Sequence, residues 1–233
     1  MNPTAICIFH NIHKENALLL SLRLKIPMLN ELRENETLLI MGAGCAPYKL
    51  LDFQFKNPVK YIIYQAENIH SPFFEDKKYR LLLKNNIVYN YSQHTADYME
   101  THWGIKTVGL FEWEFFNRDN RYYDCDNPID LLFYGFPNEE RKSVEALLKE
   151  KFPTKNIVFA YQVYDQEQAD LLVRSKYVLN IPYFPNSALE THRINQALFA
   201  GCRVISKKSC CHYLNEKYKK KIKFIHDWLD IEI

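Results

Sequence analysis

Two charged side chains stand at the start of an apolar helical stripe near the carboxyl-terminal end of the chain. In the segment 186–206, "NSALETHRINQALFAGCRVIS", a helical period places Glu190 and Arg193 on the same face as the apolar residues of the next turns. The amino terminus of a helix presents unpaired N–H groups and about half a positive charge, and an arginine adds a planar fork of donors. This combination favours binding of a phosphate, with the carboxylate accepting from the hydroxyls of a ribose.

Two structural readings of the same residues stay open. Ser187 and Glu190 have the Ser-x-x-Glu spacing of a capping box, in which the glutamate only satisfies the backbone at the helix start. Glu190 and Arg193 are three residues apart and could instead form a surface ion pair of little energetic consequence.

Short apolar runs alternate with helical patterns along the whole chain. The helices expected from this pattern include 14–24, 144–151 and 166–174, and the opening segment is expected to become helical near Ala188. This alternation predicts an α/β fold with parallel sheets, in which ligands bind at the carboxyl ends of the strands. The expected strands are 5–9, 37–41, 59–64, 86–90, 106–110, 129–134, 156–160, 176–181, 203–206 and 223–225.

The polar and aromatic segment 112–128 interrupts this alternation and ends in Asn-Pro. We therefore expect two Rossmann-like domains that face a cleft, 1–116 on the acceptor side and 117–233 on the donor side. The net charge of +2 disfavours nucleic acid as a partner. The longest apolar run is too short to span a membrane, and the six cysteines fit reduced thiols, so we expect a cytoplasmic protein.

The segments "IDLLFYGFPNEERKSVEALL", "SKYVLNIPYF" and "LETHRINQALFAGCRVIS" together resemble the carboxyl-terminal domain of glycosyltransferases of the GT-B fold. Upstream, "YIIYQAENI" and "IVYNYSQHTADYM" are similar to the end of the amino-terminal domain of these enzymes. The resemblance covers about residues 61–206 and implies a metal-independent enzyme that uses a nucleoside-diphosphate sugar, such as a UDP- or GDP-sugar, and no cofactor.

The resemblance also implies roles for individual residues. Glu190 would bind the ribose or sugar of the donor and Arg193 the diphosphate, while Gly135 would form a tight turn near Arg141. Many relatives carry a second glutamate where this chain has Gln196, which leaves the role of that position in doubt. The expected donor-binding residues are Gly135, Arg141, Asn180, Tyr183, Ser187, Glu190, Arg193 and Gln196.

A glycine pair in the first half gives a competing interpretation. "LLIMGAGCAPY" places Gly42 and Gly44 after a strand, and Glu67 ends the next strand, where a ribose-binding acid of a dinucleotide or S-adenosylmethionine site would lie. A tight turn after the second strand is the favoured explanation of the glycines, and the resemblance to GT-B enzymes implies small residues there that let an acceptor approach. The Asp-x-Asp sequence at 124–126 lies in the irregular connection, so we expect no metal site there.

Glycosyl transfer with inversion needs a base for the acceptor hydroxyl, and His10 and Glu67 are the candidates at strand ends in the first half. The expected function is transfer of a sugar to a glycan, lipid or protein acceptor. The alternatives are a methyltransferase-like Rossmann enzyme and a non-catalytic nucleotide-sugar or glycan-binding module. A peripheral contact with anionic lipid could form through Lys217, Lys219, Lys220, Lys221 and Lys223.

Overall fold

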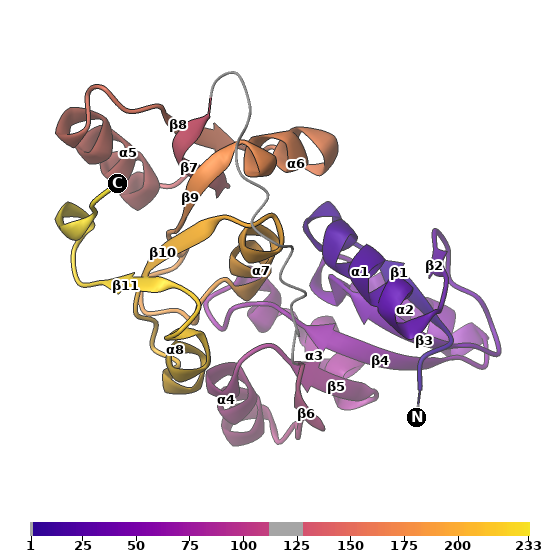
Figure 1. Ribbon diagram of the computed structural model, residues 1–233. Coiled ribbons are helices and arrows are strands. Elements are labelled where there is room, and N and C mark those ends of the chain that lie inside the picture. Colours follow the sequence, from indigo (N-terminus) through magenta and orange to yellow (C-terminus); the bar gives the residue numbers. More distant parts are fainter. Residues whose placement is uncertain (1, 112–127) are drawn as a thin grey trace. The chain divides into compact units, whose positions relative to one another are not determined.

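A computed structural model describes residues 2–111 and 128–233 of the chain (Figure 1). The chain divides into two compact units, Met1–Glu112 and Trp113–Ile233. The predicted domain boundary after residue 116 and the acidic sequence at 124–126 lie outside the described residues.

The first unit contains a parallel sheet of six strands in the order β2-β1-β3-β4-β5-β6. Val, Ile, Leu and Tyr side chains fill both faces of its central strands, as expected for a sheet covered by helices on either side. The strands are β1 (Ala5–Ile8), β2 (Met28–Leu29), β3 (Thr37–Met41), β4 (Lys60–Gln65), β5 (Ile87–Asn90) and β6 (Gly109–Leu110).

Helices and short 3-10 turns connect these strands. They are η1 (Asn11–His13), α1 (Lys14–Leu24), η2 (Ala43–Cys45), α2 (Pro47–Lys56), η3 (Pro72–Glu75), α3 (Lys77–Lys84) and α4 (Gln93–Trp103). The strand order changes direction between β1 and β3, because β2 lies on one side of β1 and β3 on the other. The loops that follow β1 and β3 therefore flank a topological switch point, where open α/β sheets form their ligand crevice.

The second unit repeats this arrangement with five parallel strands in the order β11-β10-β9-β7-β8. Figure 1 shows β7 between β8 and β9, so the switch point lies at the carboxyl ends of β7 and β9. The elements are β7 (Ile129–Gly135), α5 (Glu139–Lys151), β8 (Ile157–Tyr161), α6 (Asp165–Val173), β9 (Ser175–Asn180), α7 (Thr191–Phe199), β10 (Arg203–Lys207), α8 (His212–Tyr218), β11 (Lys223–Ile225) and η4 (Trp228–Asp230).

The predicted α/β fold with two parallel-sheet units is confirmed. Strands 37–41 and 223–225 and helix 14–24 have the predicted bounds, whereas the two-residue strand β2 was not predicted. The start of α7 near Ala188 was wrong, because the helix begins at Thr191. Glu190 has a φ of −76° and a ψ of 77°, which lies outside the helical region, so the helix cannot extend back through it to Ala188.

Candidate functional site

The switch point of the second unit is filled by a network of three charged side chains. Glu190, the residue before α7, lies between the guanidinium groups of Arg141 from α5 and Arg193 from α7. Arg141 donates from Nη2 to both carboxylate oxygens, at 2.9 and 3.3 Å, and Arg193 Nη1 is ion-paired with Oε2. The sequence therefore brings together residues from the two loops that flank the switch point.

Backbone carbonyls at the ends of β7 and β9 use the remaining donors of Arg141. Its Nε and Nη2 donate to the carbonyl of Ile181 at 3.1 and 2.6 Å, and its Nη1 donates to that of Phe136 at 2.6 Å. The side chain is 1% exposed. Arg141 thus ties the two loops together and does not present its guanidinium to a ligand.

Arg193 is held in the same way. Its Nε donates to the carbonyl of Tyr134 at 2.9 Å, and its Nη1 donates to Asn180 Oδ1 at 3.3 Å. The guanidinium carbons of Arg193 and Arg141 lie 5.0 and 4.9 Å from the centre of the Phe133 ring, within the range of cation–π attraction. Because Arg193 is only 4% exposed, the structure gives it an internal role in place of the predicted contact with a diphosphate.

Gly135, the last residue of β7, makes room for this network. Its φ is 149°, and a Cβ atom at this position would lie 2.7 Å from Arg193 Nη2. An L side chain would be strained at that φ and would also collide with the guanidinium. The glycine at this position is therefore required by the close approach of Arg193, and its predicted role near the donor stays a prediction.

The network fixes the charge of its carboxylate. Burial opposes ionisation of Glu190, but Arg193 and Arg141 outweigh burial and hold the pKa of Glu190 below its usual value. Burial lowers the pKa of Arg141 to about 10, a value at which the guanidinium stays charged at neutral pH. Arg141 and Glu190 are therefore both ionised under ordinary conditions.

The capping-box interpretation of Ser187 and Glu190 was wrong. Glu190 is itself the N-cap of α7 and makes no side-chain cap bond. Its Oε1 instead accepts from the backbone N–H of Tyr183 at 2.7 Å, which fixes the loop after β9. Ala188 and Leu189 are each 2% exposed in front of the helix, so the amino end of α7 is packed and not an open phosphate cradle.

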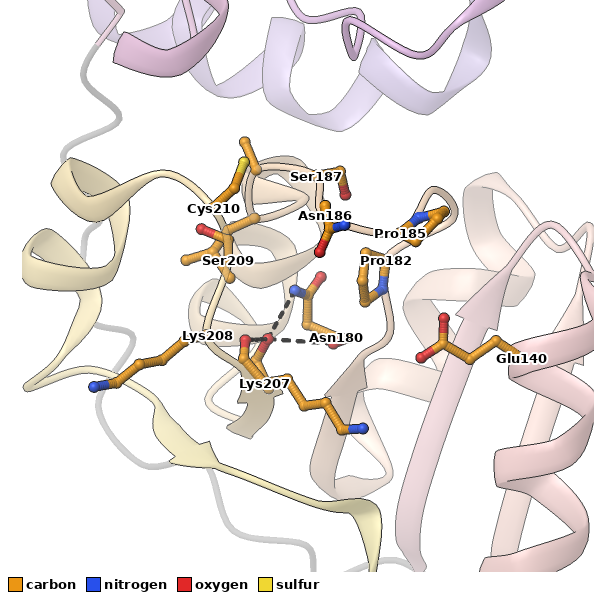
Figure 2. Close-up of a pocket in the computed structure, with 13 residues that line it drawn as sticks. Glu140, Asn180, Pro182, Pro185, Asn186, Ser187, Lys207, Lys208, Ser209 and Cys210 are labelled. Atoms are coloured by element: carbon orange, nitrogen blue, oxygen red, sulfur yellow. Dashed lines mark hydrogen bonds between the residues drawn. The ribbon is translucent and has the colours of Figure 1, made fainter.

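A pocket of about 400 Å³ lies next to this network, at the carboxyl ends of β9 and β10. Figure 2 shows Asn180 and the loop residues Pro182, Asn186 and Ser187 on one side and Lys207 to Cys210 on the other. Its volume falls within the roughly 300–1,000 Å³ typical of small-molecule sites. The predicted residues Asn180 and Ser187 both line it.

The floor of this pocket is polar and rigid. Asn180 Nδ2 donates to Ser206 Oγ at 3.0 Å, and both residues are at most 1% exposed. Lys207 and Lys208 extend from the wall, and Lys207 points toward the side on which Glu140 lies (Figure 2). Sequence reasoning missed Lys207, Lys208 and Ser206, although the order Ser-Lys-Lys-Ser at the end of a predicted strand was a usable signal.

Two aromatic rings are exposed beside the charged network. Tyr183 is 38% and Phe136 is 52% exposed, and their ring centres are 6.4 Å apart. The Arg141 guanidinium lies 5.2 Å from the Tyr183 ring, and Asn138 donates to the Tyr183 carbonyl at 2.8 Å. The phenol ring of Tyr183 is therefore partly exposed at the surface, and its predicted place in a ligand crevice stays a prediction.

Gln196 lies in the interior of the second unit. It is 6% exposed, and its Oε1 accepts from Tyr134 OH at 3.1 Å and from Gln168 Nε2 at 3.0 Å. With its carbonyl oxygen engaged by two buried donors, the amide packs α7 against β7 and α6. This geometry gives Gln196 a structural role and does not support the predicted contact with a ligand.

The first unit places its predicted residues along the carboxyl edge of β1, β3 and β4. Gly42 has a φ of 76° and packs against His10, whose backbone N would lie 3.0 Å from an added Cβ. Gly44 packs against Glu67, whose Oε1 would lie 3.1 Å from an added Cβ, and against Phe73. The glycine backbone is therefore covered by side chains, which disfavours the S-adenosylmethionine loop that the glycine pair suggested.

Three further predictions concern a metal site, a membrane-spanning helix and a lysine-rich surface for lipid. Within the described ranges, no group of three or more His, Cys, Asp or Glu side chains could hold a metal ion. No helix among the described residues is long and apolar enough to cross a bilayer. The lysines proposed for lipid contact lie at the end of α8 and in β11, where Lys219 pairs with Glu216 at 2.5 Å and Lys223 with Glu232 at 3.9 Å. Their contact with a membrane stays a prediction.

Comparison with known proteins identifies no matching family model and no matching curated protein. The structure of a UDP-GlcNAc 2-epimerase from Neisseria meningitidis bound to UDP-GlcNAc is similar to this chain, with 13% sequence identity and a TM-score of 0.42. The match covers 95% of this chain and 78% of the epimerase chain. The structure of the glycotransferase of kitacinnamycin is 8% identical in sequence, with a TM-score of 0.42. That match covers 100% of this chain and 88% of the glycotransferase chain. Because both TM-scores lie below 0.5, neither likeness decides what this chain binds.

Proposed function

We propose that the chain is a glycosyltransferase that binds a nucleoside-diphosphate sugar in the pocket of the second unit. The observation that carries the proposal is the position of the pocket at the carboxyl ends of the adjacent parallel strands β9 and β10, the edge of a parallel sheet at which α/β proteins bind ligands. It rests on a rigid floor and is lined by two lysines. This site replaces the predicted one at Glu190 and Arg193, whose groups are engaged within the protein.

The charges of the pocket suit a diphosphate. Lys207 and Lys208 give the lining two positive charges and Glu140 gives it one negative charge, so the lining is net positive. The Lys207 ammonium lies 5.1 Å from the centre of the Trp228 ring, and the Lys208 side chain points away from Asn180 and Pro182 (Figure 2). Negative charge grows on the departing diphosphate during transfer, and fixed cations stabilise that charge most in the transition state. The Asn186 amide lies on the same lining and can hydrogen-bond sugar or phosphate oxygens.

The exposed rings of Tyr183 and Phe136 offer a surface for the nucleobase. Stacking on an aromatic ring contributes about 1–3 kcal/mol per base. The backbone of Tyr183 is fixed by hydrogen bonds from its N–H to Glu190 and from Asn138 to its carbonyl. The buried network would thus contribute to donor binding indirectly, because it holds the ring-bearing loop in place.

Titration calorimetry of the full chain with UDP, GDP and uridine tests this function. We expect a nucleoside diphosphate to bind, and we expect Lys207→Ala and Lys208→Ala to weaken its binding at least fivefold while binding of the nucleoside changes little. Lys220→Ala is the matched control, because Lys220 is exposed at the end of α8 and does not line the pocket.

Three results would count against the proposal. Failure of every nucleoside diphosphate to bind at millimolar concentration would remove the donor site. Equal weakening of nucleoside and diphosphate by the lysine variants would place the phosphates elsewhere. Binding with no transfer to water or to any glycan would favour the non-catalytic binding module.

A further inference from the structure

The loop between β10 and α8, residues 208–211, forms one wall of the pocket in the second unit. Lys208, Ser209 and Cys210 of this loop line the pocket, together with Lys207 at the end of β10 (Figure 2). Lys208 and Cys210 are exposed and Ser209 is half-buried, so side-chain packing holds little of this wall. The shape of the wall therefore depends on the hydrogen bonds of the loop.

Asn215 of α8 binds this loop through three hydrogen bonds to a single residue. Its Oδ1 accepts from the Ser209 N–H at 2.9 Å and from the Ser209 hydroxyl at 3.0 Å. Its Nδ2 donates to the Ser209 carbonyl at 2.8 Å. Both acceptor positions of the side-chain oxygen are thus used on Ser209, and the N–H and carbonyl of Ser209 are fixed together. Asn215 is not among the residues that line the pocket.

Further hydrogen bonds connect the loop to its surroundings. The Ser209 Oγ accepts from the Cys211 N–H at 3.2 Å, which fixes the residue before α8. The Cys210 N–H donates to the Ser187 carbonyl at 3.3 Å, and Ser187 lies in the loop after β9 that forms the other side of the pocket. Three consecutive N–H groups of the wall are therefore used inside the protein, and its side chains are left to bind a ligand.

The two lysines of the lining directly precede Ser209. Because Asn215 fixes the N–H and the carbonyl of Ser209, the backbone from which Lys207 and Lys208 project is held in one conformation. A wall that is ordered before binding avoids the loss of conformational entropy that a flexible loop suffers when a ligand binds to it. The clamp on Ser209 therefore favours binding of an anion by the lysines.

We propose that Asn215 is a positioning residue of this pocket, which fixes the loop 208–211 so that Lys207 and Lys208 are placed for a diphosphate before the ligand arrives. This inference rests on the proposed function, which assigns the pocket to a nucleoside diphosphate. Asn215 acts through Ser209, since it does not itself line the pocket.

Titration calorimetry of the full chain with UDP, GDP, uridine and guanosine tests the inference on Asn215→Ala, which removes all three bonds to Ser209. Affinity for the diphosphate should fall about tenfold, because the loop must then be ordered on binding, whereas affinity for the nucleoside should change less than about twofold. Asn156→Ala is the matched control. Asn156 donates to the Pro128 carbonyl at 3.0 Å at the amino ends of β7 and β8, the edge of the sheet opposite the pocket. This control should leave the ratio of the two affinities unchanged.

Two further measurements separate positioning from general stability. Hydrogen exchange of the Ser209 and Cys211 N–H groups should become about tenfold faster in Asn215→Ala, while exchange in β9 and β10 stays as in the wild type. In a chain that also carries Lys207→Ala and Lys208→Ala, Asn215→Ala should change diphosphate affinity by less than about twofold, because residues that act through one another are not additive.

Ser209→Ala provides a second, milder variant. It keeps both backbone bonds to Asn215 and loses the hydroxyl that Asn215 and the Cys211 N–H share. We expect diphosphate affinity to fall about threefold. If Asn215→Ala does not fold, this variant decides the question, and a Ser209→Ala affinity equal to that of the wild type would overturn the inference.

The contrary results are distinct. Faster exchange in the loop with diphosphate affinity unchanged would overturn the positioning role, and so would unchanged exchange. Equal weakening of diphosphate and nucleoside, or a loss that adds in full to that of the lysine variants, would also overturn it and leave the pocket as the donor site. Failure of the wild type to bind any nucleoside diphosphate would instead overturn the proposed function, and this inference with it.

Discussion

Replacement of Glu190 by glutamine tests the charged network as a source of stability. Glutamine keeps the size of the side chain and an oxygen that can accept from the Tyr183 N–H, but it removes the negative charge between Arg141 and Arg193. The two arginines are 1% and 4% exposed, so neither regains full hydration when the carboxylate is lost. We therefore expect a large loss of stability.

The magnitude follows from the desolvation of the two guanidinium groups. Breaking a buried ion pair by removing one partner typically costs about 3–5 kcal/mol. Carbonyls of Tyr134, Phe136 and Ile181 continue to accept from the arginines, so we expect the lower end, about 3 kcal/mol. For a unit of this size, that loss corresponds to a midpoint lowered by roughly 10 °C.

Urea and thermal unfolding of the full chain, followed by circular dichroism, measure this loss. The two units can unfold in separate transitions, and only that of the second unit should move. Glu139→Gln is the matched control, because the Glu139 side chain is 93% exposed and its pair with Lys142 spans 3.4 Å. That control should change stability by less than about 0.5 kcal/mol.

The pH dependence gives a second readout. Since the folded state holds the pKa of Glu190 below its usual value, its stabilisation is complete above the unfolded pKa of about 4.5 and is lost as the pH falls through the folded value. The gap between wild type and Glu190→Gln should therefore shrink in acid. A Glu190→Gln variant within about 1 kcal/mol of wild type at pH 7 would refute the assignment of a buried, mutually dependent network.

Three further outcomes are expected. Gly135→Ala should destabilise the second unit by about 2 kcal/mol or more in thermal melts, because the new Cβ would meet Arg193 Nη2. Gly109→Ala is the control, because a Cβ there would lie 4.0 Å from its nearest neighbour, Tyr89 Cε1. Because burial raises the pKa of Glu67 to about 7, the free energy of unfolding falls as the pH rises from about 4.5 to 7. Glu67→Gln should remove this decline, which is of order 1–3 kcal/mol. An unchanged dependence of the melting temperature on pH between pH 5 and 8 would contradict the assignment. Gln196→Glu buries a carboxylate, so it should lower the free energy of unfolding by about 2 kcal/mol at pH 7 and by less in acid. Equal stability of this variant at pH 7 and pH 4, measured by urea unfolding, would show that the site is hydrated.

The pattern of apolar runs was enough to predict two parallel-sheet units, because strand and helix periods are local properties of the chain. Strand 37–41 and helix 14–24 were predicted with their bounds for this reason. The strand Met28–Leu29 was missed, since two residues carry no period, and it forms only by pairing with β1.

The roles of the candidate residues depended on contacts between distant parts of the chain. Spacing brought Glu190 and Arg193 together, and the pair does form, but its burial depends on Arg141, which lies 49 residues earlier. Glu67 and Glu190 are both glutamates that follow a strand, but folding gives them opposite environments. The Glu190 carboxylate is neutralised by two guanidinium groups, whereas the Glu67 carboxylate packs against Gly44 and has no ion pair with another residue that the structure describes.

The sequence by itself therefore determined which elements form and which ends of the strands carry polar groups. The tertiary structure alone decided which of those groups face solvent and which are used inside the protein. The physical reason is that the pKa and the availability of a charged side chain depend on desolvation and on partners brought close by folding, and neither can be read from spacing along the chain.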